Sequence, residues 1–221
     1  MSISDIETRK SPTKVLVLGA TGGTGRLIVS KAVALGYEVT ALVRSAEKAG
    51  DITGARLVIG DARDEAALRQ ALRGQNAVIS ALGTPISPFK QVTLLSTATR
   101  LLVRAMHAEQ VPRLVAITGM GAGDSFGHGG LLFDRVIYPL LLKKVYADKN
   151  RQEALIRESS LDWVLVRPAV LNDKPGRRSS RMLENLSGFH GGSIARADLA
   201  SFVVDQLGSD TWLRRAPLVT W

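Results

Sequence analysis

The sequence predicts a single α/β domain, in which a doubly wound parallel sheet carries helices on both faces. Short β-rich runs alternate along the chain with longer segments of helical periodicity. This alternation is typical of parallel strands joined by right-handed crossovers. The chain has 221 residues, of which 45% are hydrophobic and 22% charged. Those values are ordinary for one globular domain.

The strands and helices are predicted from apolar periodicity and from the residues that end each run. The continuous apolar run KVLVLG at 14–19 is typical of a strand buried on both faces. Further strands are expected at 38–43, 55–59, 76–81, 114–118 and 162–167, the last of them ended by Pro168. Helices are expected at 23–35, 64–73, 91–110, 131–158 and 197–207.

The ends and the composition of the chain set its expected surroundings. Residues 1–12 are polar and are expected to form a flexible leader before a domain at 13–221. No apolar stretch reaches membrane-spanning length, and the N-terminus lacks a signal-peptide pattern. We therefore predict a cytoplasmic protein that does not associate with a membrane. The chain contains no cysteine, which excludes disulfides, thiolate metal sites and a catalytic thiol.

The net charge of +9 leaves three interpretations open. It can reflect a solvated basic surface, attraction of a small anionic ligand, or binding of nucleic acid. The basic residues fall in short scattered clusters, such as Lys143-Lys144 and Arg214-Arg215, with acids between them. Nucleic acid is therefore disfavoured as a partner.

A glycine-rich turn, GATGGTGR at 19–26, follows the first strand and opens the first helix. Glycines at 19, 22 and 25 allow a sharp turn, close approach of the backbone to a diphosphate, and close packing of the helix on the sheet. The N–H groups at the start of the helix and its dipole favour an anion there. The turn residues expected to contact a dinucleotide are Gly19, Thr21, Gly22, Gly23, Thr24, Gly25 and Arg26.

The residue after the second strand predicts which dinucleotide binds. In NAD-selective sites an acidic residue accepts hydrogen bonds from the ribose hydroxyls. Arg44 takes that place here, with Lys48 nearby. A guanidinium can hold a 2′-phosphate through charge-assisted bonds, so we predict NADP(H) in preference to NAD(H). A surface arginine without this role is the alternative.

The string GATGGTGR and several later motifs resemble the extended and atypical short-chain dehydrogenase/reductase superfamily. The later motifs are LVIGDARD, AVISALGT, VPRLVAITGMG, SSLDWVLVRPAVLNDKPG and IARADLASFVV. They are most similar to the single-domain NAD(P)H-binding group, which includes flavin reductase/biliverdin-IXβ reductase-like enzymes and nitrogen-repressor-like redox sensors. The resemblance implies a Rossmann-type fold.

Further cofactor contacts are implied by the resemblance. Asp61 looks like the family residue that faces the adenine edge, although it could instead cap the following helix. Small residues after the fourth strand would line the ribose and diphosphate. The remaining cofactor-binding candidates are Ala62, Ala81, Leu82, Gly83, Thr118, Lys149 and Pro168.

The catalytic candidates are Tyr146, Lys149 and Thr118. The extended short-chain enzymes use a Tyr-x-x-x-Lys pair for proton transfer, with the lysine also binding the nicotinamide ribose. Here Lys149 lies at the family position, but the residue four before it is Val145, and Tyr146 forms a Tyr-x-x-Lys pair instead. Tyr146 could transfer the proton or be a packing aromatic. Lys149 could bind the nicotinamide ribose or be a solvated helix residue.

The other candidate groups leave open alternatives. Thr118 could bind the substrate oxygen or simply end its strand. Flavin and biliverdin reductases carry a hydroxyl residue and a histidine where this chain has Gly119 and Ala169, so their substrate is not carried over. The histidines, at 107, 128 and 190, are far apart in sequence, and a metal site is not expected.

The substrate is expected beside segments 119–146 and 169–192. The first joins a glycine-rich loop to apolar residues and could be a lid or pocket wall, or a core helix packed on the sheet. The function predicted is an NADPH-dependent reductase of a small planar or apolar acceptor such as a flavin, quinone or carbonyl. The alternative is a non-catalytic NAD(P)H sensor. The sequence leaves monomer and homodimer open.

Overall fold

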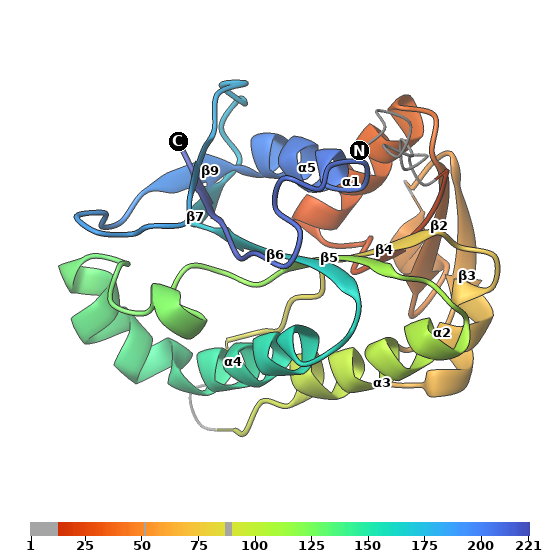
Figure 1. Cartoon of the computed structure of the whole chain (residues 1–221), viewed down its shortest axis with the longest axis horizontal. Helices are drawn as coiled ribbons and strands as arrows, with labels where there is room; N and C mark the ends of the chain where they lie inside the picture. The colour runs from red at the N-terminus through yellow and green to blue at the C-terminus, as the bar shows by residue number, and fades with distance from the viewer. Residues whose placement is uncertain (1–12, 51, 87–89) are drawn as a thin grey trace, which may run out of the picture.

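The structure, a computed structural model, describes residues 13–50, 52–86 and 90–221. The predicted leader at 1–12 lies outside these residues. The central sheet has eight strands in the order β3-β2-β1-β4-β5-β6-β10-β8 (Figure 1). These strands are β1 (Lys14–Leu18), β2 (Glu38–Val43), β3 (Ala55–Ile59), β4 (Ala77–Ser80), β5 (Arg113–Ile117), β6 (Asp162–Pro168), β8 (Arg181–Leu183) and β10 (Leu218–Thr220).

The sheet confirms the predicted doubly wound α/β class. Its strands are parallel except β8, which pairs with β10 in the antiparallel direction. Helices cover both faces, as Figure 1 shows: α1 and α5 lie on one side, and α2, α3 and α4 on the other. The helices are α1 (Gly23–Ala34), α2 (Glu65–Leu72), α3 (Leu94–Ala108), α4 (Lys143–Arg157) and α5 (Arg196–Asp205).

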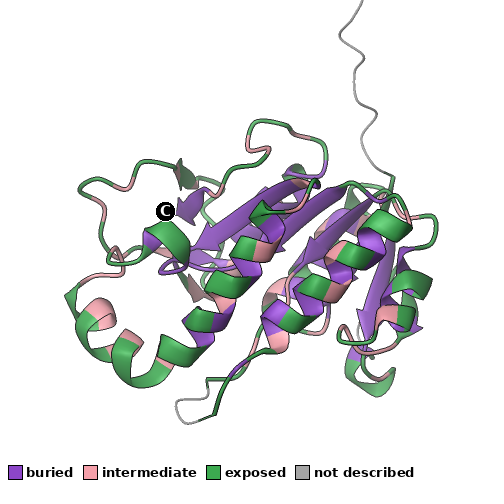
Figure 2. Cartoon of the chain, turned by 60° about the horizontal axis from the view of Figure 1, so that its bottom comes forward, coloured by how far each residue is buried: buried purple, intermediate pink, exposed green. Residues whose placement is uncertain are grey.

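The strands separate two hydrophobic cores, which explains their continuous apolar sequence. Val15 and Val17 of β1 face the core beneath α1 and α5, whereas Leu16 and Leu18 face the core beneath the other helices. Burial is concentrated in the sheet and on the inner faces of the helices, as the colouring of Figure 2 shows. Strand order reverses between β1 and β4, which lie side by side, so a ligand site is expected at their carboxyl ends.

Four short strands in the last third of the chain were not predicted. They are β8 and β10 of the central sheet and the pair β7 (Val170–Asn172) and β9 (Ser193–Ala195), which form a small parallel sheet of their own. Each spans three residues. Such strands are too short to show a periodicity and form because a partner strand supplies their hydrogen bonds.

Two boundaries also differ from the prediction. The single helix expected at 131–158 is divided into a π-helix, η4 (Phe133–Leu142), and α4, because Pro139 has no N–H to continue a regular helix. Strand β6 does not end before Pro168 but includes it, with Val219 of β10 as its partner. The carbonyl of Pro168 then accepts the N–H of Met120 at 3.0 Å.

Candidate functional site

In the turn between β1 and α1, the fold requires glycine at two positions, 19 and 25. Gly19 has a φ of +77°, and a Cβ there would overlap the carbonyl of Ala81. A Cβ on Gly25 would overlap the carbonyl of Gly19, so α1 can approach the sheet only without it. Gly22 differs, since a Cβ there would meet only the Gly19 oxygen at 3.4 Å, an ordinary contact. The folded chain does not itself require glycine at 22.

The N-terminus of α1 is suited to an external anion. Its N-cap is Gly22, which has no side chain to accept the first N–H groups, and its first turn holds no acidic residue. The helix α2, by contrast, is capped by Asp64, whose carboxylate accepts the N–H of Ala66 at 2.9 Å. Helix α3 is capped from α4, because Asp148 accepts the N–H of Leu95 at 2.8 Å. A diphosphate therefore fits the end of α1.

Arg26 fixes the outer side of this turn. Its Nε donates to the carbonyl of Thr21 at 3.1 Å, and its Nη2 donates to the carbonyl of Lys48 at 2.9 Å. The side chain thus ties the turn to the segment after β2.

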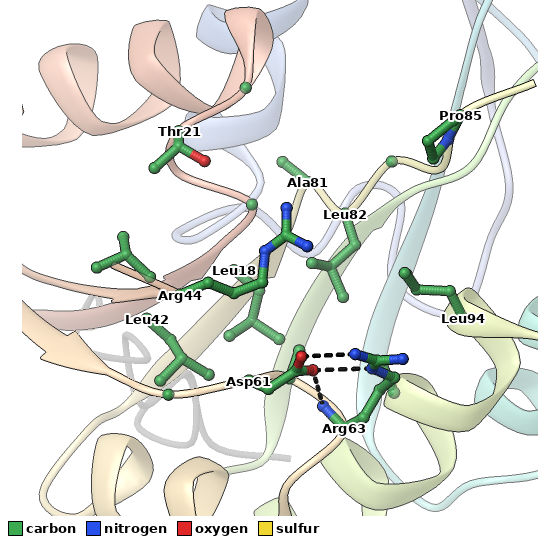
Figure 3. Close-up of a pocket in the computed structure, with 17 residues that line it drawn as sticks. Leu18, Thr21, Leu42, Arg44, Asp61, Arg63, Ala81, Leu82, Pro85 and Leu94 are labelled. Carbon is green, nitrogen blue, oxygen red and sulfur yellow. Dashed lines mark hydrogen bonds and ion pairs between the residues drawn. The ribbon is translucent and has the colours of Figure 1, made fainter. Parts of the chain in front are cut away.

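A pocket of about 330 Å³ opens at the carboxyl ends of β1 to β4 (Figure 3). It brings together nine of the predicted cofactor residues: Gly19, Thr21, Gly22, Arg44, Asp61, Ala62, Ala81, Leu82 and Gly83. The predicted turn residues Gly23, Thr24, Gly25 and Arg26 are not among those that line it. Lining residues that the sequence analysis did not name are Leu18, Leu42, Val43, Gly60, Arg63, Pro85, Leu94 and Ala98.

Two arginines and one carboxylate set the charge of this pocket. Oδ2 of Asp61 accepts a hydrogen bond from Nη2 of Arg63 at 2.8 Å, and Oδ1 accepts the Arg63 N–H at 2.8 Å. These bonds, with a smaller contribution from the Arg44 charge, lower the pKa of Asp61 to about 2. Arg44 is exposed, and its side chain extends across the pocket in Figure 3. An anionic group on the ligand would meet it.

The proposal that Asp61 caps the following helix is wrong. That helix, α2, is capped by Asp64, and Asp61 instead fixes the turn before it through Arg63. Arg63 was missed because a single arginine after a strand carries no distinguishing pattern. Its role comes from the bend at 61–63, which folds its side chain back onto Asp61.

A second pocket, of about 250 Å³, lies at the carboxyl ends of β5 and β6. Predicted residues among its lining are Thr118, Lys149, Tyr146 and Pro168. The others are Gly119, Met120, Phe133, Ala169, Val170 and Leu171. Because β4 and β5 are neighbours in the sheet, the two pockets lie along the same edge. The lining is mainly apolar, with one ammonium group.

Lys149 supplies that ammonium group. Its Nζ donates a hydrogen bond to the carbonyl of Thr118, which leaves two of its three N–H bonds for other partners. Burial lowers the pKa of Lys149 to about 8, although the nearby Glu153 carboxylate acts in the opposite direction. The ammonium form of Lys149 therefore predominates at neutral pH and is lost as the pH rises through about 8.

The phenol of Tyr146 is bonded to the backbone. Its Oη donates to the carbonyl of Met120 at 2.7 Å. Its ring packs against Phe133 and Tyr138, with centroids 6.2 and 5.2 Å away. Burial, with a smaller effect of Tyr138, raises the pKa of Tyr146 to about 12. These contacts favour the packing alternative for Tyr146.

A buried ion pair lies behind the second pocket and was not predicted. The Thr118 hydroxyl donates to Oε1 of Glu153 at 2.7 Å. Oε1 and Oε2 of Glu153 also accept hydrogen bonds from Arg167, at 3.0 and 2.6 Å. All three side chains are buried. No local spacing in the sequence indicates this pair, because Glu153 lies on α4 and Arg167 on β6.

The helix η4 of the substrate-side segment is at the periphery rather than in the core. No residue of η4 is buried, and the neighbouring Leu131 is 75% exposed, so the core-helix alternative is wrong. Phe133 alone of η4 reaches the second pocket, together with Val170 and Leu171 from β7. Met182, which belongs to the predicted substrate-side segment 169–192, lies on β8 and is not part of the lining.

Two of the histidines, although far apart in the sequence, are neighbours in the structure. The rings of His128 and His190 stack with centroids 5.7 Å apart. They meet because the N–H of Gly191 donates to the carbonyl of His128 at 2.7 Å. Among the described residues, no group of three or more histidine and carboxylate side chains could hold a metal ion.

The family model for NAD(P)H-binding proteins matches residues 19–210. The chain therefore belongs to the NAD(P)H-binding family, which confirms the predicted resemblance to NAD(P)H-binding proteins. In the described part of the chain, no helix has the length and apolar character needed to cross a bilayer.

Curated relatives share modest identity with the chain. It is 25% identical to the uncharacterized chloroplastic protein At2g34460 of Arabidopsis thaliana, over 94% of this chain and 76% of that protein. It is 27% identical to the chloroplastic protein TIC 62 of the same plant and 26% identical to the photosystem II assembly factor Ycf39 of Synechocystis. These matches cover 75% and 91% of this chain, but only 30% of TIC 62 and 60% of Ycf39.

Solved structures share the fold over nearly the whole chain. ChuY, an anaerobillin reductase from Escherichia coli O157:H7, superposes with a TM-score of 0.81 at 22% identity, over 94% of this chain and 97% of ChuY. A wide-type short-chain dehydrogenase/reductase from Veillonella parvula in complex with NADP superposes with a TM-score of 0.76 at 15% identity, over 95% of each chain.

Proposed function

We propose that the protein is an NADPH-dependent reductase of a small planar or apolar acceptor. The observation that carries the proposal is the pair of pockets along one edge of the sheet. The first combines Arg44 with the glycine turn, which leads into a helix without a side-chain N-cap. The second combines an apolar lining with Lys149. A dinucleotide laid along this edge would place its two halves in the two pockets.

The first pocket is assigned to the adenosine half. The amide groups at the start of α1 bind the diphosphate, and the Arg44 guanidinium binds a 2′-phosphate. The carboxylate of Asp61 stays ionised at neutral pH and is held by Arg63, so it can accept a hydrogen bond from the adenine amino group. This charge distribution supports NADPH over NADH, because an acidic residue is absent from the end of β2 and an arginine follows it.

The second pocket is assigned to the reaction. A bound reduced nicotinamide would supply the hydride. Lys149 binds the nicotinamide ribose. In its ammonium form, its Nζ donates the proton that accompanies hydride transfer to the acceptor. The Thr118 carbonyl orients Lys149, and the Thr118 hydroxyl is held by Glu153. Tyr146 holds the loop at Met120 in place rather than transferring a proton.

The acceptor is assigned by the lining of the second pocket. Met120, Phe133, Ala169, Val170 and Leu171 present apolar surface and few hydrogen-bonding groups. Such a surface binds a flat, apolar molecule by burial rather than by recognition of many polar groups. The structural likeness to ChuY, an anaerobillin reductase, adds tetrapyrroles to the flavins, quinones and carbonyl compounds considered.

Oxidation of NADPH, followed by its absorbance, tests the proposal against a panel of flavins, quinones, aldehydes and linear tetrapyrroles. We expect turnover with at least one class and stronger binding of NADPH than of NADH. Wild-type protein that binds neither dinucleotide would refute the assignment of both pockets.

A non-catalytic NADPH sensor is the second candidate. It is favoured by the hydrogen bonds of Tyr146 to Met120 and of Thr118 to Glu153, since both hydroxyls that could serve chemistry have protein partners. Tight binding of NADPH without turnover of any panel member, together with a change in protease sensitivity on binding, would support the sensor.

A further inference from the structure

Arg196 is the first residue of α5 and lies over the start of α1. The helices pack side by side on the same face of the sheet (Figure 1). A Cβ built on Gly23 would lie 3.4 Å from both Cδ and Nε of Arg196. The stem of this arginine therefore covers the first residue of α1, next to the glycine turn, and Gly23 leaves room for it.

The position of this guanidinium is electrostatically unfavourable without an anion. It lies at the N-terminal end of α5 and beside the N-terminal end of α1, and both ends carry a partial positive charge. The first turn of α1 has no acidic residue. The first turn of α5 has Asp198, but its carboxylate accepts the N–H groups of Arg177 and Arg178 and the indole N–H of Trp221.

The anion found beside Arg196 is weakly held. Nη1 of Arg196 donates to Oδ1 of Asp173 at 2.8 Å, while the Asp173 side chain is 84% exposed and that of Arg196 only 28% exposed. An ion pair with so exposed a partner contributes little to stability, because water screens it. Asp173 lies just beyond β7, in the loop that leads away from the second pocket. A stronger anion at the end of α1 can therefore replace it.

We infer that Arg196 is a diphosphate-binding residue, which exchanges Asp173 for a phosphate oxygen of the bound dinucleotide. This inference rests on the proposed function, since it concerns the same cofactor. It adds a positively charged side chain beside the backbone amides at the start of α1. It also links the loop that carries Asp173 to occupancy of the cofactor site.

The test is a titration of four proteins with three ligands. The proteins are the wild type, Arg196→Gln, Asp173→Asn and, as a matched control, Arg215→Gln. Arg215 forms a similar exposed pair with Glu184, at 2.9 Å, on another part of the surface. The ligands are NADPH, ADP-ribose, which keeps the diphosphate, and adenosine 2′-monophosphate, which lacks it. Calorimetry measures each dissociation constant.

We expect Arg196→Gln to weaken the binding of NADPH and of ADP-ribose by about 10-fold or more, because one charge-assisted hydrogen bond is lost. The affinity for adenosine 2′-monophosphate should not change. Asp173→Asn should bind NADPH more tightly than the wild type, because it removes the competing carboxylate. Arg215→Gln should behave as the wild type.

Equal NADPH affinity of Arg196→Gln and the wild type would overturn the inference while leaving the proposed function intact. Equal weakening of all three ligands would also overturn it, because that result indicates a general change in the fold. Should Arg196→Gln fold poorly, Asp173→Asn keeps the test decisive, since unchanged or weaker NADPH binding by that variant contradicts the exchange. Failure of the wild type to bind any dinucleotide would reject both proposals.

Discussion

The phenol of Tyr146 donates a hydrogen bond of 2.7 Å to the carbonyl of Met120, so its proton is directed into the protein. A pKa raised to about 12 keeps it protonated at neutral pH. In this chain the tyrosine one position away from the family register therefore supports a loop, and the ammonium group of Lys149, which we propose as the proton donor, lines the same pocket.

Replacement of Tyr146 by phenylalanine tests this separation of roles. The change removes one hydrogen bond and should lower the free energy of unfolding by about 1 kcal/mol. NADPH-dependent turnover should be retained, because the ring and its packing remain. Unfolding by denaturant and steady-state kinetics measure the two effects. Loss of turnover in a folded Tyr146→Phe protein would indicate that Tyr146 is the proton donor.

The pH dependence of turnover follows from Lys149. In the proposed mechanism the protonated form donates the proton, and with a pKa of about 8 the fraction protonated falls as the pH rises through that value. We expect kcat to be nearly constant below this pKa and to decline above it. Lys149→Met should lose this dependence together with most of the activity. A wild-type profile that stays flat well above pH 8 would contradict the assignment.

The glycine turn allows a comparison between stability and binding. Gly22→Ala should fold with nearly unchanged stability, since its φ is −78° and a Cβ would make only an ordinary contact. It should nevertheless weaken the binding of NADPH, because the added methyl group obstructs the diphosphate. Gly25→Ala should destabilise the fold itself, because its Cβ would overlap the carbonyl of Gly19. Thermal unfolding and cofactor titration separate the two outcomes; identical behaviour of the two variants would contradict them.

Arg44 is predicted to select the cofactor. Arg44→Asp should weaken the binding of NADPH by about 10- to 100-fold, which corresponds to the loss of one charge-assisted contact. The binding of NADH should change far less. Arg73→Asp, at another exposed arginine, controls for the change in net charge. Dissociation constants for both dinucleotides provide the measurement. A similar loss for NADH and NADPH would show that Arg44 does not contact the 2′-phosphate.

The buried pair of Glu153 and Arg167 is predicted to support the second pocket. Glu153→Gln leaves the Arg167 charge partly uncompensated in the interior and should cost about 3 kcal/mol or more. Glu158→Gln, on the exposed end of the same helix, should cost little. Chemical denaturation compares the two. Equal stability of both variants would mean that the pair contributes nothing to the fold.

The sequence was sufficient for the first six strands of the sheet and for about half of the residues that line the first pocket. The first six strands and their helices have the length and apolar content that periodicity can detect, and the cofactor turn is local, since residues 19–26 are adjacent in the chain. The side chains after β2, β3 and β4 could be assigned to one site because parallel strands bring their carboxyl ends together.

Only the tertiary structure decided the groups that act across long sequence separations. Glu153 meets Thr118 and Arg167 from another element, Asp148 caps a helix from α4, and Arg196 reaches Gly23 from the far end of the chain. No local pattern specifies these contacts, because they depend on how two elements pack and where each side chain points. The same reason applies to Tyr146: its spacing from Lys149 is visible in the sequence, whereas its hydrogen bond to Met120 exists only after the loop has folded over α4.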